Sequence, residues 1–188
     1  MIVRIQLWRR WRADRDRRGR ASTFVASLLA EPPESDVRWL AETATGGDVD
    51  HARWELRYLR RAAGLLAAQR DALDDRTASL VSAALLRALR RDPQVAPDRA
   101  DVAARQFNTR LAAYADALEA KGGDARPGER LGRVLLGFAG RLDPGPEELV
   151  AAGQRVGAYR RESSDALRAA FGTAALPDDI APSQIRAG

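Results

Sequence analysis

The chain has 188 residues, 45% of them hydrophobic, which is enough to bury the core of one domain. It contains no cysteine and one histidine, so disulfides, thiol nucleophiles, cysteine-ligated metals, multi-histidine metal sites and His/Met-ligated haem are excluded. The net charge is +5. Because residues 1–20 carry eight arginines against Asp14 and Asp16, that segment holds +6 and the remainder of the chain −1.

Alanine, leucine and arginine are strong helix formers and dominate the composition, whereas aromatic residues make up only 6%. Residues that favour strands are correspondingly scarce. The composition therefore predicts an all-α fold, and the pattern of apolar residues and of proline and glycine indicates where its helices begin and end.

The N-terminal segment is the most basic part of the chain. Its apolar residues include a stripe at helical spacing, formed by Val3, Leu7, Trp8 and Trp11. Apolar and polar residues also alternate over residues 3–7, as they do in a strand. Because no partner strand is evident elsewhere, we favour a helix. Residues 12–20 are expected to be a solvated, flexible run of charges.

Two short helices are predicted next. Ser22 or Thr23 can cap the first, which Pro32 and Pro33 end. Ser35 can cap the second, which Gly46 and Gly47 end.

Five longer helices with apolar stripes follow and make up the main body. They are predicted over residues 48–73, 76–91, 97–121, 127–142 and 146–171. Their short connections imply antiparallel packing between sequence neighbours. In the fourth of these helices we expect Leu142 to face inward and Gly132, Gly137 and Gly140 to permit close packing between helices.

The expected architecture is thus an antiparallel helical bundle of about five main helices, preceded by two short helices and a basic arm. Residues 1–21 are the predicted arm, residues 22–172 the bundle, and residues 173–188 an extended C-terminal tail.

The arm is the strongest candidate for a functional surface. Arginine makes bidentate contacts with phosphate or carboxylate, and tryptophan supplies an amphipathic anchor. A basic helix with apolar residues on its other side is typical of a helix that lies at a membrane surface. The predicted docking residues are Arg4, Leu7, Trp8, Arg9, Arg10, Trp11, Arg12, Arg15, Arg17 and Arg18.

A second basic stripe is predicted on the helix over residues 48–73. It consists of Arg53, Arg57, Arg60 and Arg61, flanked by Trp54 and Tyr58. Like charges at this spacing mildly destabilise a helix, so acidic groups elsewhere in the chain or on a partner are expected to offset them. The alternative is a solvated face on which the arginine stems cover apolar surface.

Neither the acidic cluster nor the lone histidine predicts chemistry. Asp71, Asp74 and Asp75 could hold Mg²⁺ for diphosphate chemistry, but no convincing second cluster accompanies them, and helix capping explains Asp74 and Asp75. His51 is expected to be exposed or to act as a cap in the first turn of its helix. We predict no catalytic, cofactor-binding or metal-binding residue.

The expected function is that of a non-catalytic helical accessory or scaffold subunit. It would dock through the arm onto the cytoplasmic face of a membrane or of a large membrane protein complex, such as a respiratory or photosynthetic assembly. The expected partners are protein subunits of that assembly and an anionic membrane surface, with no small-molecule substrate. The alternatives are a nucleic-acid-associated helical protein or regulator, and a small all-α enzyme of the isoprenoid type.

The expected location is the cytoplasm, peripheral on the inner face of the membrane. No apolar run approaches the length of about 18 residues that a membrane-spanning helix needs. The apolar segment at the start of the sequence is too short and carries too much charge to be the hydrophobic region of a secretory signal.

Overall fold

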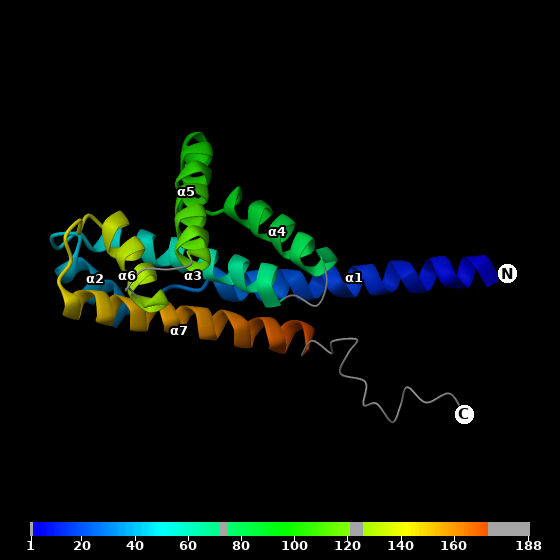
Figure 1. The fold of residues 1–188 in the computed structure, drawn as a ribbon. Coiled ribbons are helices and arrows are strands. Elements are labelled where there is room, and N and C mark those ends of the chain that lie inside the picture. The colour runs from blue at the N-terminus through cyan, green and yellow to red at the C-terminus, as the bar shows by residue number, and fades with distance from the viewer. Residues whose placement is uncertain (1, 72–74, 121–125, 173–188) are drawn as a thin grey trace, which may run out of the picture.

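The computed structural model describes residues 2–71, 75–120 and 126–172, and for residues 2–11 and 13 it describes the backbone alone. Over these ranges the chain forms seven α-helices, one short 3-10 helix and no strand. In chain order they are α1 (Ile2–Leu28), α2 (Glu34–Thr43), α3 (Val49–Asp71), α4 (Asp75–Leu89), η1 (Pro97–Arg99), α5 (Ala100–Glu119), α6 (Pro127–Phe138) and α7 (Pro146–Phe171) (Figure 1). The prediction of an all-α fold is confirmed. The predicted tail, residues 173–188, lies outside the described residues.

Helix α3 is the central element of the body and contacts each of the other six α-helices. Its leucines Leu56 and Leu59 are fully buried, as the apolar stripe predicted. Ala52, Ala62 and Ala68 are buried as well, and side chains of this size let neighbouring helices approach α3 closely from several sides. An alanine-rich central helix thus allows many neighbours to share a core in which each contact buries little area.

Helix α1 is one continuous helix where the sequence predicted a charged flexible run followed by a short helix. Ser22 and Thr23 do not cap a helix start. Their hydroxyl groups donate hydrogen bonds to the backbone carbonyls four residues earlier, over 2.9 and 3.2 Å. Both residues therefore lie inside the helix, where serine and threonine make this bond as an alternative to capping. Because arginine is a strong helix former, the run over residues 12–20 is helical.

Only the C-terminal part of α1 belongs to the core. Ala21, Phe24, Val25 and Leu28 are buried, and Leu28 lies directly against Gly64 of α3. The helix therefore crosses the boundary at residue 21 that the sequence suggested between arm and bundle. Its N-terminal turns extend beyond every other helix of the molecule (Figure 1).

Helix α2 begins without the predicted serine cap. Pro33 occupies the N-cap position and Ser35 lies within the first turn. The backbone carbonyl of Pro33 accepts the first two bonds of the helix, from the N–H groups of Asp36 and Val37. The predicted end of the helix is close to the observed one, since Gly46 and Gly47 take positive φ values of 65° and 94° just after it.

Helices α6 and α7 form an antiparallel pair that is held together by glycine. A Cβ atom on Gly132 would lie 2.8 Å from the backbone of α7, and one on Gly153 would lie 2.6 Å from the carbonyl oxygen of Gly128. The prediction for Gly132 is confirmed. It is wrong for Gly137, whose Cβ would meet no atom within 4 Å, and Gly140 serves a turn with a φ of 100°.

Two further expectations about packing are wrong. Leu142 is 85% exposed, because α6 ends at Phe138 and the chain turns before Leu142 can reach the core. Helices α4 and α5 are neighbours in the chain, yet within the described residues they scarcely touch and instead diverge (Figure 1). The 90–99 connection between them lies over α3 and forms part of the wall of a hollow there.

Candidate functional site

The predicted docking residues lie on the projecting part of α1. The side chains of Arg4, Leu7, Trp8, Arg9, Arg10 and Trp11 lie outside the described residues, but their backbone is helical. Arg12, Arg15 and Arg18 are exposed and Arg17 is half-buried. Where the helix leaves the body, Asp14 pairs with Arg76 of α4 across 2.5 Å, which ties α1 to α4 at this point.

The second basic stripe is paired with acids of the same chain. Arg57 binds both carboxylate oxygens of Glu31, over 2.7 to 3.1 Å, in the connection between α1 and α2. Arg61 binds Asp92, which follows α4, across 2.6 Å, and both side chains are largely buried.

The two remaining arginines of the stripe are paired in the same way. Arg53 contacts Glu34 of α2 at 3.1 Å, and Arg60 contacts Glu162 of α7 at 2.8 Å. Of the two sources of acidic groups that the sequence left open, the chain itself supplies them. These arginines therefore connect α3 to its neighbours.

The flanking aromatic residues of the stripe, Trp54 and Tyr58, lie one turn apart on the same side of α3. Trp54 is half-buried, with the guanidinium group of Arg57 4.9 Å from its ring centroid. Tyr58 is buried and donates a hydrogen bond to the side-chain oxygen of Gln106 on α5, over 3.0 Å. Burial raises the pKa of Tyr58 although Arg110 and Arg61 act to lower it, so its hydroxyl group stays protonated.

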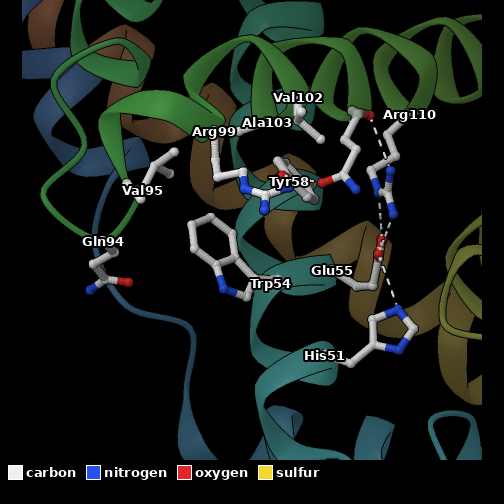
Figure 2. A pocket seen from close by; sticks show the side chains of 12 residues that line it. His51, Trp54, Glu55, Tyr58, Gln94, Val95, Arg99, Val102, Ala103 and Arg110 are labelled. Atoms are coloured by element: carbon white, nitrogen blue, oxygen red, sulfur yellow. Dashed lines mark hydrogen bonds and ion pairs between the residues drawn. The ribbon is translucent and has the colours of Figure 1, made fainter.

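A cleft of about 400 Å³ opens between α3 and the chain from Gln94 to Arg110 (Figure 2). We call it the α3–α5 cleft. Trp54 and Tyr58 of α3 form one wall, with ring centroids 5.7 Å apart. The connection after α4, η1 and the first turns of α5 form the opposite wall. The residues that line the cleft thus come from α3, from the connection that follows α4, and from η1 and α5.

A buried carboxylate lies at one end of the cleft. Glu55 is 3% exposed and both its oxygens accept hydrogen bonds from Arg110 of α5, with Nε of Arg110 2.7 Å from Oε2. The Nε2 atom of His51, one turn earlier on α3, lies 3.4 Å from Oε1 (Figure 2). The side chain of His51 is half-exposed, and its ring faces Glu55. It caps no helix start, since the first turn of α3 is capped instead by Asp48, whose carboxylate accepts from the N–H of His51.

Burial and charge act in opposite directions on Arg110. Burial alone would lower the pKa of its guanidinium group, but the hydrogen bonds and the charge of Glu55 together raise it above the ordinary value. The group also lies between two aromatic rings, 4.8 Å from the centroid of Tyr58 and 4.6 Å from that of Phe138. The pKa of Tyr114 nearby is raised, mainly by burial and to a smaller extent by the negative charge of Glu55. This end of the cleft is a fixed, internally neutralised ion pair.

Sequence reasoning missed Glu55 and Arg110. The available signal was a glutamate within the apolar stripe of the central helix, one turn after Ala52 and one turn before Leu59. A charged residue at such a position requires a partner.

The acidic cluster is divided by the fold. Asp71 accepts a hydrogen bond from the hydroxyl group of Ser164 over 3.2 Å, Asp75 lies in the first turn of α4, and Asp74 lies outside the described residues. Within the ranges that the structure describes, no group of three or more His, Asp or Glu side chains is placed to hold a metal ion. No described helix is long and apolar enough to cross a membrane.

No protein-family model, curated protein or solved structure matches this chain. Proposals about its function therefore depend on the geometry of the arm and of the α3–α5 cleft.

Proposed function

We propose that this protein is a non-catalytic helical accessory subunit that docks through the projecting part of α1 onto the cytoplasmic face of a membrane or of a membrane protein complex. The observation that carries the proposal is the projection itself, because the most basic segment of the chain continues α1 beyond the body (Figure 1).

The helical register of this segment supports an interfacial role. Each residue of an α-helix advances by about 100° around the axis. The apolar stripe formed by Val3, Leu7, Trp8 and Trp11 then spans roughly 140° of the circumference, and Arg9, Arg10 and Arg12 occupy the rest. Three residues do not follow this division: Arg4 falls within the apolar arc, and Ile2 and Ile5 fall on the arginine side. A helix of this pattern buries its apolar side in the headgroup region and keeps its arginines among lipid phosphates.

The charge distribution also supports this role. The basic stripe on α3 is paired with acids of its own chain, so the excess of positive charge remains on the arm. Each arginine near an anionic membrane surface contributes about 1 kcal/mol to binding, and the tryptophans add apolar burial. Nucleic acid would use the same arginines, but we disfavour it because the basic stripe that the sequence predicted on the body is paired with acids of its own chain.

The test compares two triple variants of equal charge. We expect Arg4→Gln/Arg9→Gln/Arg10→Gln to weaken binding to phosphatidylglycerol-containing vesicles at least tenfold, since three arginines contribute about 3 kcal/mol before screening. Arg38→Gln/Arg133→Gln/Arg161→Gln removes the same charge from exposed positions of the body, and should leave binding within about twofold of the parent. Co-sedimentation at physiological ionic strength measures both.

Deletion of residues 2–12 removes the N-terminal part of the arm, with both of its tryptophans, and keeps the Asp14–Arg76 pair and the buried part of α1. It should retain the helical circular dichroism spectrum and lose vesicle binding. Equal weakening by both triple variants would mean that net charge alone attracts the protein, which contradicts a specific arm. Binding of the parent to duplex DNA but not to the vesicles would favour the nucleic-acid alternative.

A further inference from the structure

The α3–α5 cleft is a second candidate surface, on the body rather than on the arm, and it is separate from the docking proposed above. Its volume of about 400 Å³ lies in the range that proteins use for small organic ligands. Its two walls differ in chemistry, and this difference restricts what it could bind.

The wall on α3 is aromatic. Trp54 and Tyr58 form a tilted pair, and the guanidinium groups of Arg57 and Arg61 lie 4.9 and 6.0 Å from the centroid of Trp54. Across the cleft, Val102 in the first turn of α5 is 36% exposed and adds an apolar side chain to the opposite wall. A flat apolar group is the shape that such walls accommodate with most contact.

The charge in the cleft is positive. The Glu55 carboxylate is neutralised by Arg110, and the charged group that remains is the guanidinium of Arg99. Arg99 is 73% exposed and reaches from η1 toward Trp54 and Tyr58 (Figure 2). Its ion pair with Asp98 is long, at 3.6 Å, and uses Nε. Among the described residues, no hydrogen bond within 3.5 Å joins the guanidinium group of Arg99 to an acid, and its one ion pair is this longer contact.

We propose that the α3–α5 cleft binds a small aromatic carboxylate, with its ring against Trp54 and Tyr58 and its carboxylate on Arg99. The terminal nitrogens of arginine match the geometry of a carboxylate and bind it in a bidentate manner. An aromatic cation is disfavoured because Arg99 would repel it. The Glu55–Arg110 pair fixes the spacing of α3 and α5 at the end of the cleft.

The experiment is a titration of the full chain with naphthalene-2-carboxylate, followed by NMR through the indole N–H signal of Trp54. The neutral comparator is naphthalene-2-methanol and the non-aromatic comparator is cyclohexanecarboxylate. We expect the aromatic acid to bind at least tenfold more tightly than either comparator, since each removes one of the two required contacts. The Trp54 signal should shift, and those of the other three tryptophans should not.

Two variants test the assigned contacts. Arg99→Gln should weaken binding of the aromatic acid about tenfold and leave the alcohol nearly unchanged, because only the charged contact is lost. Val102→Glu, at an exposed position, should weaken the acid at least as much by introducing a like charge. Arg105→Gln is the matched control, because Arg105 is an exposed arginine of α5 that does not line the cleft.

The proposal is overturned if the alcohol binds as tightly as the acid, if Arg105→Gln weakens binding as much as Arg99→Gln, or if no titration shifts the Trp54 signal. None of these outcomes affects the docking proposal, because the vesicle experiment involves a different part of the chain.

Discussion

Replacement of Glu55 by alanine should lower the free energy of unfolding by about 3–5 kcal/mol, because it leaves a largely buried arginine without its counter-charge. The side chains of Glu55 and Arg110 are 3% and 12% exposed, so water cannot replace the lost carboxylate at small cost. The aromatic rings of Tyr58 and Phe138 on either side of Arg110 further limit its movement toward solvent. Urea unfolding at neutral pH, followed by circular dichroism, measures the effect.

The matched control is Glu162→Ala. Glu162 also pairs with an arginine of α3, Arg60, and also lies within a long helix, but its side chain is 55% exposed. Its loss should change the free energy of unfolding by less than about 1 kcal/mol, because exposed pairs are screened by water and salt. A double variant, Glu55→Leu/Arg110→Met, should recover most of the stability, since both charges are removed together.

A change of less than about 1 kcal/mol in the free energy of unfolding of Glu55→Ala would contradict a buried Glu55–Arg110 pair. It would mean that Arg110 finds water or another acid without cost, and that α3 and α5 are held together by apolar contacts alone. A loss in Glu162→Ala as large as that in Glu55→Ala would show that burial does not distinguish the two pairs.

The helices of the body were predictable because each carries a local signal. Apolar residues recur every three or four positions, and proline or glycine stands at most of the ends. The helix predicted over residues 146–171 agrees with α7 at both ends, where Pro146 and Gly172 provide these signals. Such signals depend on residues close in the chain, so they can be read without knowing what the helix packs against.

The start of the chain was harder to interpret because the same residues serve two roles. Serine and threonine are good caps, yet Ser22 and Thr23 form hydrogen bonds within α1 instead. What decides between the roles is the continuity of the helix on their N-terminal side, which arginine favours and which no proline interrupts. Whether Ser22 and Thr23 cap a helix or lie within one therefore could not be predicted from those two residues alone.

The α3–α5 cleft could not be predicted because its contacts join distant residues. Arg110 is 55 residues from Glu55, and Gln106 is 48 residues from Tyr58. The pattern of α3 indicated that its arginines need acidic partners, but only the packing of the helices determines which acids they meet. The second wall of the cleft depends on where the 90–99 connection and the first turns of α5 lie over α3, which local patterns in the chain did not reveal.

The second large effect is expected at the glycine contact between α6 and α7. The variant Gly132→Ala/Gly153→Ala should lose about 4 kcal/mol of stability, since overpacking costs roughly 2 kcal/mol at each site. Each new methyl group would meet backbone atoms, at 2.8 Å for Gly132 and 2.6 Å for Gly153, and backbone cannot rotate away as a side chain can. The helices must then move apart and lose contacts elsewhere along the pair. Thermal or urea unfolding measures the loss.

Gly137 supplies the control within the same helix. A Cβ at Gly137 meets no atom within 4 Å, so Gly137→Ala should raise the free energy of unfolding by about 0.5 kcal/mol, because alanine restricts the unfolded chain and favours the helix. The opposite signs expected at Gly132 and Gly137 separate the local preference for helix from the close approach of α7. If alanine stabilised both positions equally, α6 could move away from α7 without loss, and the glycines would not determine the distance between the two helices.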